Sequence, residues 1–168
     1  MCGIQSCKTL FTKKQIPHIP VDIEYLVNDE VFWNDVNIML FAFKDYSKEY
    51  KYYSERHEAL TSERGFSYLN SEICVKLLER LAKIELDILK IFDDDKFNNT
   101  YKSWKALHEK REISWINSIY NYFIQHGFFN GILYCGVQHG YSVINRVNKI
   151  KDNYNFQMNW KFNDLPIT

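Results

Sequence analysis

The stretch Arg111–Ile144, which reads REISWINSIYNYFIQHGFFNGILYCGVQHGYSVI, carries most of what the sequence predicts about the fold. Residues 101–124 contain no glycine and no proline, and their apolar side chains recur at spacings of three, four and seven. This pattern predicts one amphipathic helix. Residues 98–100 can cap its start, and Gly127 is expected to end it.

A short apolar run between two glycines, residues 131–136, follows this helix. Its length and flanking glycines predict a strand covered on both faces, as in a parallel sheet. Residues 141–151 then have a helical pattern, and residues 155–162 alternate strictly between apolar and polar side chains, which predicts a second strand. Residues 98–168 are therefore expected to form a helix–strand–helix–strand unit with a crossover connection.

The first part of the chain, residues 1–97, is expected to be mostly helical. Residues 35–62 lack glycine and proline and predict one long helix, and Ser71 is placed to cap a second helix that runs to Phe92. The whole chain, residues 1–168, is predicted to be one domain. Its expected fold class is α/β and helix-rich, with a small, mostly parallel sheet packed against long helices.

The expected lengths of the helix and of the strand place two charged residues and a histidine close together. Arg111 lies about 13 residues before the helix end, which is roughly 20 Å at 1.5 Å per residue. The predicted strand returns over a similar distance, roughly 20 Å at 3.3 Å per residue. Arg111 and Glu112 should then lie level with the carboxyl end of the strand, with His139 just beyond it. Ligands of open α/β sheets bind at this edge.

These three residues are the candidate catalytic group. His139 would act as a general base or bind a divalent metal, and Glu112 would orient it or be a second metal ligand. Arg111 would hold an anionic group. A catalytic metal usually has three protein ligands, and only two are identified here. The alternative is that Arg111 and Glu112 are solvated helix charges and His139 is an ordinary loop residue.

Gly136 and Gly140 flank the loop that contains His139 and are the candidate cofactor-binding residues. The loop is predicted to open the helix that begins at Tyr141. The first N–H groups of a helix lack partners and favour negative charge. An anionic group of a cofactor or substrate is therefore expected beside these glycines.

The same residues resemble a known superfamily. The helix pattern of Arg111, Glu112, Trp115 and Ile119, followed by an apolar strand and Gly136-x-x-His139, is similar to the C-terminal part of Tiki/TraB/ChaN-like proteins. Erythromycin esterases are more distant relatives. The resemblance covers roughly residues 107–150 and implies a hydrolase, or a domain that binds metal or haem. It also implies an earlier Gly-x-x-His or Glu-x-x-His element, which this chain lacks, so a truncated or degenerate member is expected.

Composition excludes some classes of protein. The 21 basic residues balance 21 acidic ones, which argues against a nucleic-acid binder. No apolar run is long enough for a membrane span, and the four cysteines lack zinc-site spacing, which favours a reducing cytoplasm. The abundant aromatic residues, 17% of the chain, suit a contact surface. A small-molecule or peptide substrate and a homo-oligomer both remain open.

Two other functions are considered. A tyrosine-rich helix and the missing first motif favour a non-catalytic helical binding or interaction module. The opening Met1-Cys2-Gly3-Ile4 resembles the start of N-terminal-cysteine amidotransferases, in which Cys2 would become the nucleophile.

Overall fold

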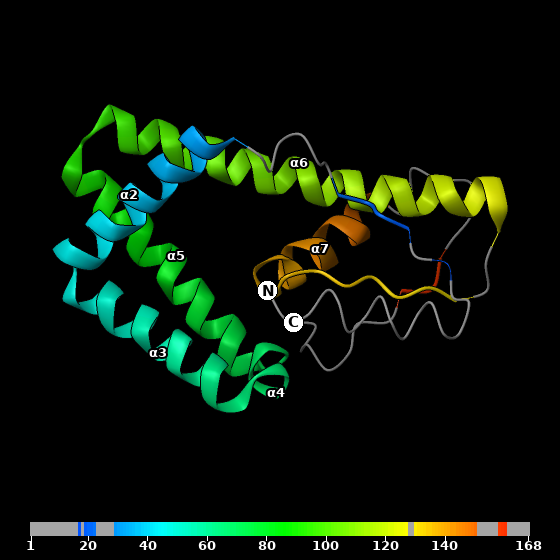
Figure 1. Ribbon diagram of the computed structural model, residues 1–168, viewed down its shortest axis with the longest axis horizontal. Helices are drawn as coiled ribbons and strands as arrows, with labels where there is room; N and C mark the ends of the chain where they lie inside the picture. Colours follow the sequence, from blue (N-terminus) through cyan, green and yellow to red (C-terminus); the bar gives the residue numbers. More distant parts are fainter. Residues whose placement is uncertain (1–16, 18, 23–28, 128–129, 151–157, 161–168) are drawn as a thin grey trace.

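The computed structural model describes residues 17, 19–22, 29–127, 130–150 and 158–160, and their regular structure is entirely helical (Figure 1). The helices are α2 (Glu30–Tyr46), α3 (Lys48–Arg64), α4 (Phe66–Leu69), α5 (Glu72–Phe92), α6 (Asp95–His126) and α7 (Val137–Ile150). These residues contain no strand. The predicted α/β class with a parallel sheet is therefore wrong, and this part of the chain is all-α.

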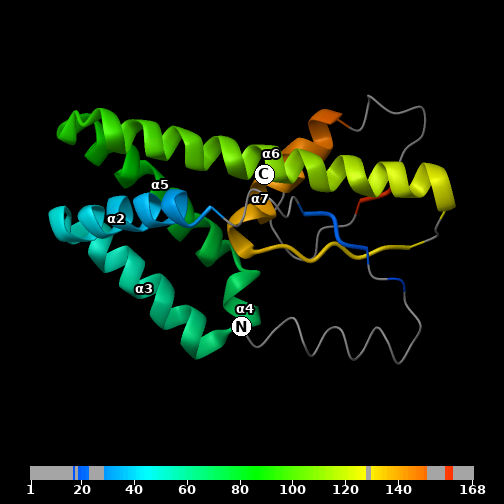
Figure 2. The same ribbon diagram turned by 45° about the horizontal axis from the view of Figure 1, so that its top comes forward.

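The first predicted strand, residues 131–136, is an irregular link between α6 and α7. A strand covered on both faces would bury its side chains, but Ile132 is 74% and Tyr134 is 64% exposed. Cys135, the last apolar residue of this run, is also exposed. Two views show this link running back beside α6 (Figures 1 and 2). An apolar run between glycines does not by itself specify a strand, because a strand also needs a partner to bond with.

The second predicted strand, residues 155–162, is described only at residues 158–160, which form no strand. Its other residues lie outside the described part of the chain. The predicted helix 141–151 exists, but it starts a turn early, at Val137, and ends at Ile150. The expected Gly136-x-x-His139 loop therefore becomes the start of α7, and Gly140 lies inside the helix instead of in a loop.

Residues 35–62, predicted to form one helix, belong to two helices that meet at Ser47. Ser47 has extended backbone angles, and its Oγ accepts a hydrogen bond of 3.1 Å from the N–H of Tyr50. Its own N–H donates to the carbonyl of Phe43 at 3.0 Å. Serine suits such a cap because its short side chain bonds the free N–H groups of the next helix. α3 therefore turns back and packs against α2.

The helices α2 to α5 and the first half of α6 share one core. Ser71 caps α5 as predicted, accepting from the N–H of Cys74 at 3.3 Å. The buried side chains of this core come from five helices. They are Val36, Met39 and Phe43 of α2, Tyr50 and Leu60 of α3, Tyr68 of α4, Cys74, Leu77, Leu81, Ile84, Ile88 and Leu89 of α5, and Tyr101 and Trp104 of α6. Each large apolar side chain buried here stabilises the fold by about 1.5–3 kcal/mol.

α6 continues from this core into a second one. It begins at Asp95, capped by Asp94, so the predicted start near residues 98–100 is a turn late. It ends before Gly127, as predicted, where φ is +66°. The second core joins Trp115, Ile116 and Tyr120 of α6 to Val143 and Val147 of α7. α7 packs against this part of α6 (Figure 1), and the predicted site residues Glu112 and His139 lie one on each of these helices.

In the described part of the chain, none of the helices is both long enough and apolar enough to cross a membrane.

Candidate functional site

The centre of the site is the carboxylate of Glu112, which is 2% exposed on α6 and receives hydrogen bonds from three residues of α7. Oε1 lies 2.7 Å from Nδ1 of His139 and accepts from Oγ of Ser142 at 2.6 Å. Oε2 accepts from Nε of Arg146 at 2.6 Å. The three partners follow one another at spacings of three and four, so they share one face of α7. This face of α7 therefore contacts α6 through the carboxylate of Glu112.

The hydrogen bonds decide the charge of Glu112. Burial alone would raise the pKa of this carboxyl group, since it penalises the charged form. The hydrogen bonds from His139, Ser142 and Arg146 outweigh burial and lower the pKa to about 2. Glu112 is therefore a carboxylate at neutral pH, and Arg146 compensates its charge.

His139 lies in the first turn of α7 and is 7% exposed. The backbone N–H of His139 donates to the backbone carbonyl of Gly136 at 2.9 Å. Because Nδ1 faces a carboxylate, the ring is assigned the tautomer in which Nδ1–H donates to Glu112. In the neutral ring, Nε2 is then the nitrogen that can accept a proton. Trp115 meets the ring edge-on, with centroids 4.8 Å apart and planes at 73°.

A second histidine, His108, packs against the ring of His139. It lies on α6 one turn before Glu112, and its ring centroid is 4.8 Å from that of His139. Burial, followed by electrostatic interactions with His139, Lys105 and Arg111, lowers the pKa of His108 to about 4. At neutral pH His108 is uncharged, so it packs against His139 without repelling it.

Arg111 points to a residue from the start of the chain. Its Nε and Nη2 donate to the two carboxylate oxygens of Asp22 at 3.0 and 2.6 Å. The indole Nε1–H of Trp115 donates to Oδ1 of the same carboxylate at 2.9 Å. The guanidinium also lies over the Trp115 ring, 5.4 Å from its centroid. Arg111 is therefore linked to His139 through Trp115 and His108, and does not contact Glu112 by any of these bonds.

The structure thus brings Glu112 and His139 into direct contact and places Arg111 beside them. The contact is made by two packed helices and not by the edge of a sheet. Sequence reasoning missed four residues of the site, which are Asp22, His108, Ser142 and Arg146. The spacing of His108 and Glu112, and of His139, Ser142 and Arg146, is the signal that a helical reading of residues 137–150 would have given.

The expected metal and cofactor roles do not fit this arrangement. Both oxygens of Glu112 already accept strong hydrogen bonds, so Glu112 is poorly suited to ligate a metal alongside His139. Residues 17, 19–22, 29–127, 130–150 and 158–160 contain no group of three His, Cys, Asp or Glu side chains placed to hold a metal ion. A Cβ on Gly136 would touch Cδ2 of His139 at 3.7 Å, an ordinary contact, so packing against the described residues does not require glycine there.

A second buried carboxylate, Glu85 of α5, lies in the first core. It accepts hydrogen bonds from the hydroxyls of Tyr50 at 3.2 Å and Tyr101 at 3.1 Å, and Nζ of Lys105 is 3.7 Å away. Burial raises the pKa of Glu85, and Lys105 and the two hydroxyls counteract only part of that effect. Glu85 therefore joins α3, α5 and α6 through one buried acidic group.

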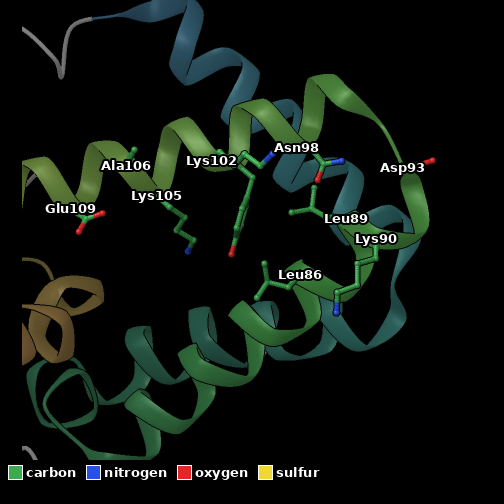
Figure 3. A pocket seen from close by; sticks show the side chains of 10 residues that line it. Leu86, Leu89, Lys90, Asp93, Asn98, Lys102, Lys105, Ala106 and Glu109 are labelled. Atoms are coloured by element: carbon green, nitrogen blue, oxygen red, sulfur yellow. The ribbon is translucent and has the colours of Figure 1, made fainter.

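A groove of about 730 Å³ lies between α5 and α6 (Figure 3). Leu86 and Leu89 of α5 and Ala106 of α6 form its apolar part, and Lys90, Lys102 and Lys105 are also among the lining residues. The ammonium group of Lys105 lies 4.5 Å from the centroid of the Trp104 ring. Glu109, at one end of the groove, pairs with Arg146 at 2.8 Å, so the groove ends beside the Glu112 site.

Comparison of this chain with known protein families, with curated proteins and with solved structures finds no match. The resemblance to Tiki/TraB/ChaN-like proteins therefore stays a prediction. The amidotransferase alternative also stays a prediction, because Cys2 lies outside the described residues.

Proposed function

We propose that His139 and Glu112 form the general acid–base pair of a hydrolase. The observation that supports this function is the 2.7 Å contact between Nδ1 of a nearly buried imidazole and an ionised carboxylate. Such a contact fixes the tautomer of a histidine and leaves Nε2 as the proton acceptor. The same pairing of carboxylate and imidazole orients the general base in many hydrolytic enzymes.

The roles follow from the contacts. Nε2 of His139 would take a proton from water while the water oxygen bonds to the electrophilic carbon of the substrate. The imidazolium would then return that proton to the leaving group as its bond to carbon breaks. Glu112 is a positioning residue that stabilises the imidazolium, and Ser142 and Arg146 hold Glu112 in place. No proton leaves Glu112 in this sequence.

The sequence resemblance supports the same class of reaction. Arg111-Glu112 and Gly136-x-x-His139 are the elements of the chain that resemble the hydrolases of the Tiki/TraB/ChaN-like superfamily. The metal-dependent form of that chemistry is not part of the proposal, because the oxygens of Glu112 are already engaged. We also propose a reducing, cytoplasmic location, which suits the free cysteines Cys74 and Cys135.

The test uses activated esters as generic substrates. We expect the purified protein to hydrolyse p-nitrophenyl esters faster than buffer, and His139→Ala to lose this activity. Glu112→Gln should lower kcat by about 10-fold or more, because the ring loses its orienting charge. Circular dichroism checks that each variant is folded. A folded His139→Ala protein that keeps the wild-type rate would refute the proposal.

A non-catalytic binding module is the second candidate, and the groove between α5 and α6 favours it. Its apolar wall and its lysines suit a small apolar molecule with a negative charge. Ligand screening by NMR separates the two candidates. A binder that shifts signals of Leu86 and Ala106, and binds His139→Ala equally well, would favour the binding module.

A further inference from the structure

Three N–H groups of α6 converge on the carboxylate of Asp22, and one of them belongs to Trp115, whose ring packs against His139. Nε and Nη2 of Arg111 and Nε1 of Trp115 all donate to Asp22, at 3.0, 2.6 and 2.9 Å. Arg111 and Trp115 are four residues apart, so they lie on one face of the helix. We refer to these three donors as the Arg111–Trp115 cradle.

The shape of the cradle matches a carboxylate. Two parallel N–H bonds from a planar guanidinium fit the two oxygens of a carboxylate, and this pairing is both strong and specific. The indole N–H adds a third donor, which a lysine in place of the arginine would not orient in the same way. In the structure Asp22 supplies the carboxylate.

The two sides of this contact differ in exposure. The side chain of Arg111 is 16% exposed and is held against the Trp115 ring. The side chain of Asp22 is 43% exposed, and the described residues 19–22 are in neither a helix nor a strand. The donors are therefore fixed by the core of the protein, while the acceptor faces solvent. Of the two sides, Asp22 is the one that a ligand can replace.

The cradle also lies beside the proposed base. The Trp115 ring that donates to Asp22 packs edge-on against His139, with centroids 4.8 Å apart. Arg111 is close enough to His108 to disfavour a charge on it, and His108 lies against His139. A molecule anchored by its carboxylate in the cradle would be bound to the same Trp115 ring that packs against the imidazole of His139.

We propose that Asp22 is an internal substitute for the carboxylate of the substrate, which displaces it from the Arg111–Trp115 cradle on binding. This assignment of a carboxylate-bearing substrate rests on the hydrolase function proposed above. The binding of a carboxylate to the cradle is a separate physical claim that needs no catalysis. Asp22 then acts as a competitor that occupies the three donors of the cradle until a substrate carboxylate displaces it.

The experiment removes Asp22 and supplies a carboxylate from solution. In Asp22→Ala, we expect the Nε1–H signal of Trp115 in ¹H–¹⁵N spectra to move, and acetate to move it back along a saturable curve. The signal is assigned with Trp115→Phe. Wild-type protein should need about tenfold more acetate or more, because Asp22 occupies the cradle and lowers the fraction of competent protein. Acetate should also raise the Tm of Asp22→Ala.

The controls separate specific binding from a general salt effect. Asp22→Ala combined with Arg111→Lys keeps the positive charge but loses the paired donors, and should show no saturable response to acetate. Chloride at equal ionic strength should leave the signal unmoved. If Asp22→Ala does not fold, Asp22→Asn replaces it, because asparagine keeps the side-chain length and removes the charge.

The outcomes decide both proposals. No saturable response to acetate in the folded Asp22 variant would overturn the inference, and tighter binding of inorganic phosphate than of acetate would overturn the assignment of a carboxylate. Adding His139→Ala should leave acetate binding intact. Binding of acetate without esterase activity would therefore refute the hydrolase alone, and esterase activity without binding would refute the cradle alone.

Discussion

Arg146 contacts two glutamates that differ in burial, and the comparison isolates the contribution of the buried one. Its Nε bonds to the buried Glu112, and its Nη1 bonds to Glu109, whose side chain is 57% exposed. An exposed ion pair contributes about 0–1 kcal/mol, whereas breaking a buried one costs about 3–5 kcal/mol. Removing the charge of Glu112 should therefore destabilise the fold much more than removing the charge of Glu109, although both pair with Arg146.

We predict that Glu112→Gln lowers the free energy of unfolding at pH 7 by about 2–4 kcal/mol, since it leaves Arg146 and His139 without their charged partner. Glu109→Gln should change it by less than about 1 kcal/mol. Urea unfolding followed by circular dichroism measures both values. Similar losses for the two variants would contradict the predicted role of the buried carboxylate.

The pH dependence of stability tests the same residue. The pKa of Glu112 is about 2 in the fold and 4.5 in an unfolded chain, so the unfolded state binds the proton first as pH falls. The stabilisation is complete above pH 4.5 and is lost as pH falls towards 2. Over this range Glu112→Gln should lose less stability than the wild type.

At the scale of single residues, the sequence predicted that Glu112 and His139 come close, but it did not predict the other residues that bond to the site. The lengths of the helix and of a predicted strand placed Glu112 near His139, although residues 131–136 form no strand. Ser142 and Arg146 were missed because Gly136 and Gly140 suggested a loop around His139. If His139 is in a loop, the sequence does not show that it shares one helix face with Ser142 and Arg146. Asp22 lies 89 residues from Arg111 in the chain, so only tertiary structure could reveal their contact.

Among the elements, three helices are joined by the buried carboxyl group of Glu85. Burial raises its pKa above the value of 4.5 for an exposed glutamate. As pH rises, the unfolded chain releases its proton first, so stability falls as pH rises above about 4.5. This direction is opposite to that of Glu112, although both are buried glutamates, because Glu85 has neutral tyrosines as its closest partners.

We predict that Glu85→Gln removes this loss of stability with rising pH while keeping hydrogen bonds to Tyr50 and Tyr101. Urea unfolding at pH 5 and pH 7 should show a smaller difference for the variant than for the wild type. Glu79→Gln, an exposed position on the same helix, is the control and should behave like the wild type. An unchanged pH dependence in Glu85→Gln would contradict the account of this group.

Helix content was more predictable than helix boundaries or strands. Ser71 and Gly127 were identified as helix ends because a hydroxyl cap and a positive-φ glycine are strong local signals. Ser47 was missed because serine is tolerated inside helices as well as at their ends. The apolar run at 131–136 was misread because its length and composition do not show whether another segment covers it.

At the scale of the whole molecule, α6 contributes to two cores, and among the described residues the second core has fewer buried side chains than the first. The first core is built from α2, α3, α4 and α5 together with the first half of α6. The second depends on α7, which packs on the other half of α6. Regions with fewer buried apolar contacts open at a lower free energy than the global unfolding of a protein. α7 is therefore expected to open while α5 stays folded.

Native-state hydrogen exchange tests this difference. We predict that the amides of Val143 and Val147 in α7 exchange through an opening of lower free energy than those of Leu81 and Ile84 in α5. Glu112→Gln should accelerate exchange in α7 by about tenfold or more, since each 1.4 kcal/mol lost at the α6–α7 contact is a factor of ten in the opening equilibrium. The α5 amides should keep their rates as long as global unfolding stays rare, and Glu109→Gln should leave both helices nearly unchanged. Equal acceleration of α5 and α7 would mean instead that the molecule unfolds as one unit, and that the carboxylate at the site stabilises both cores together.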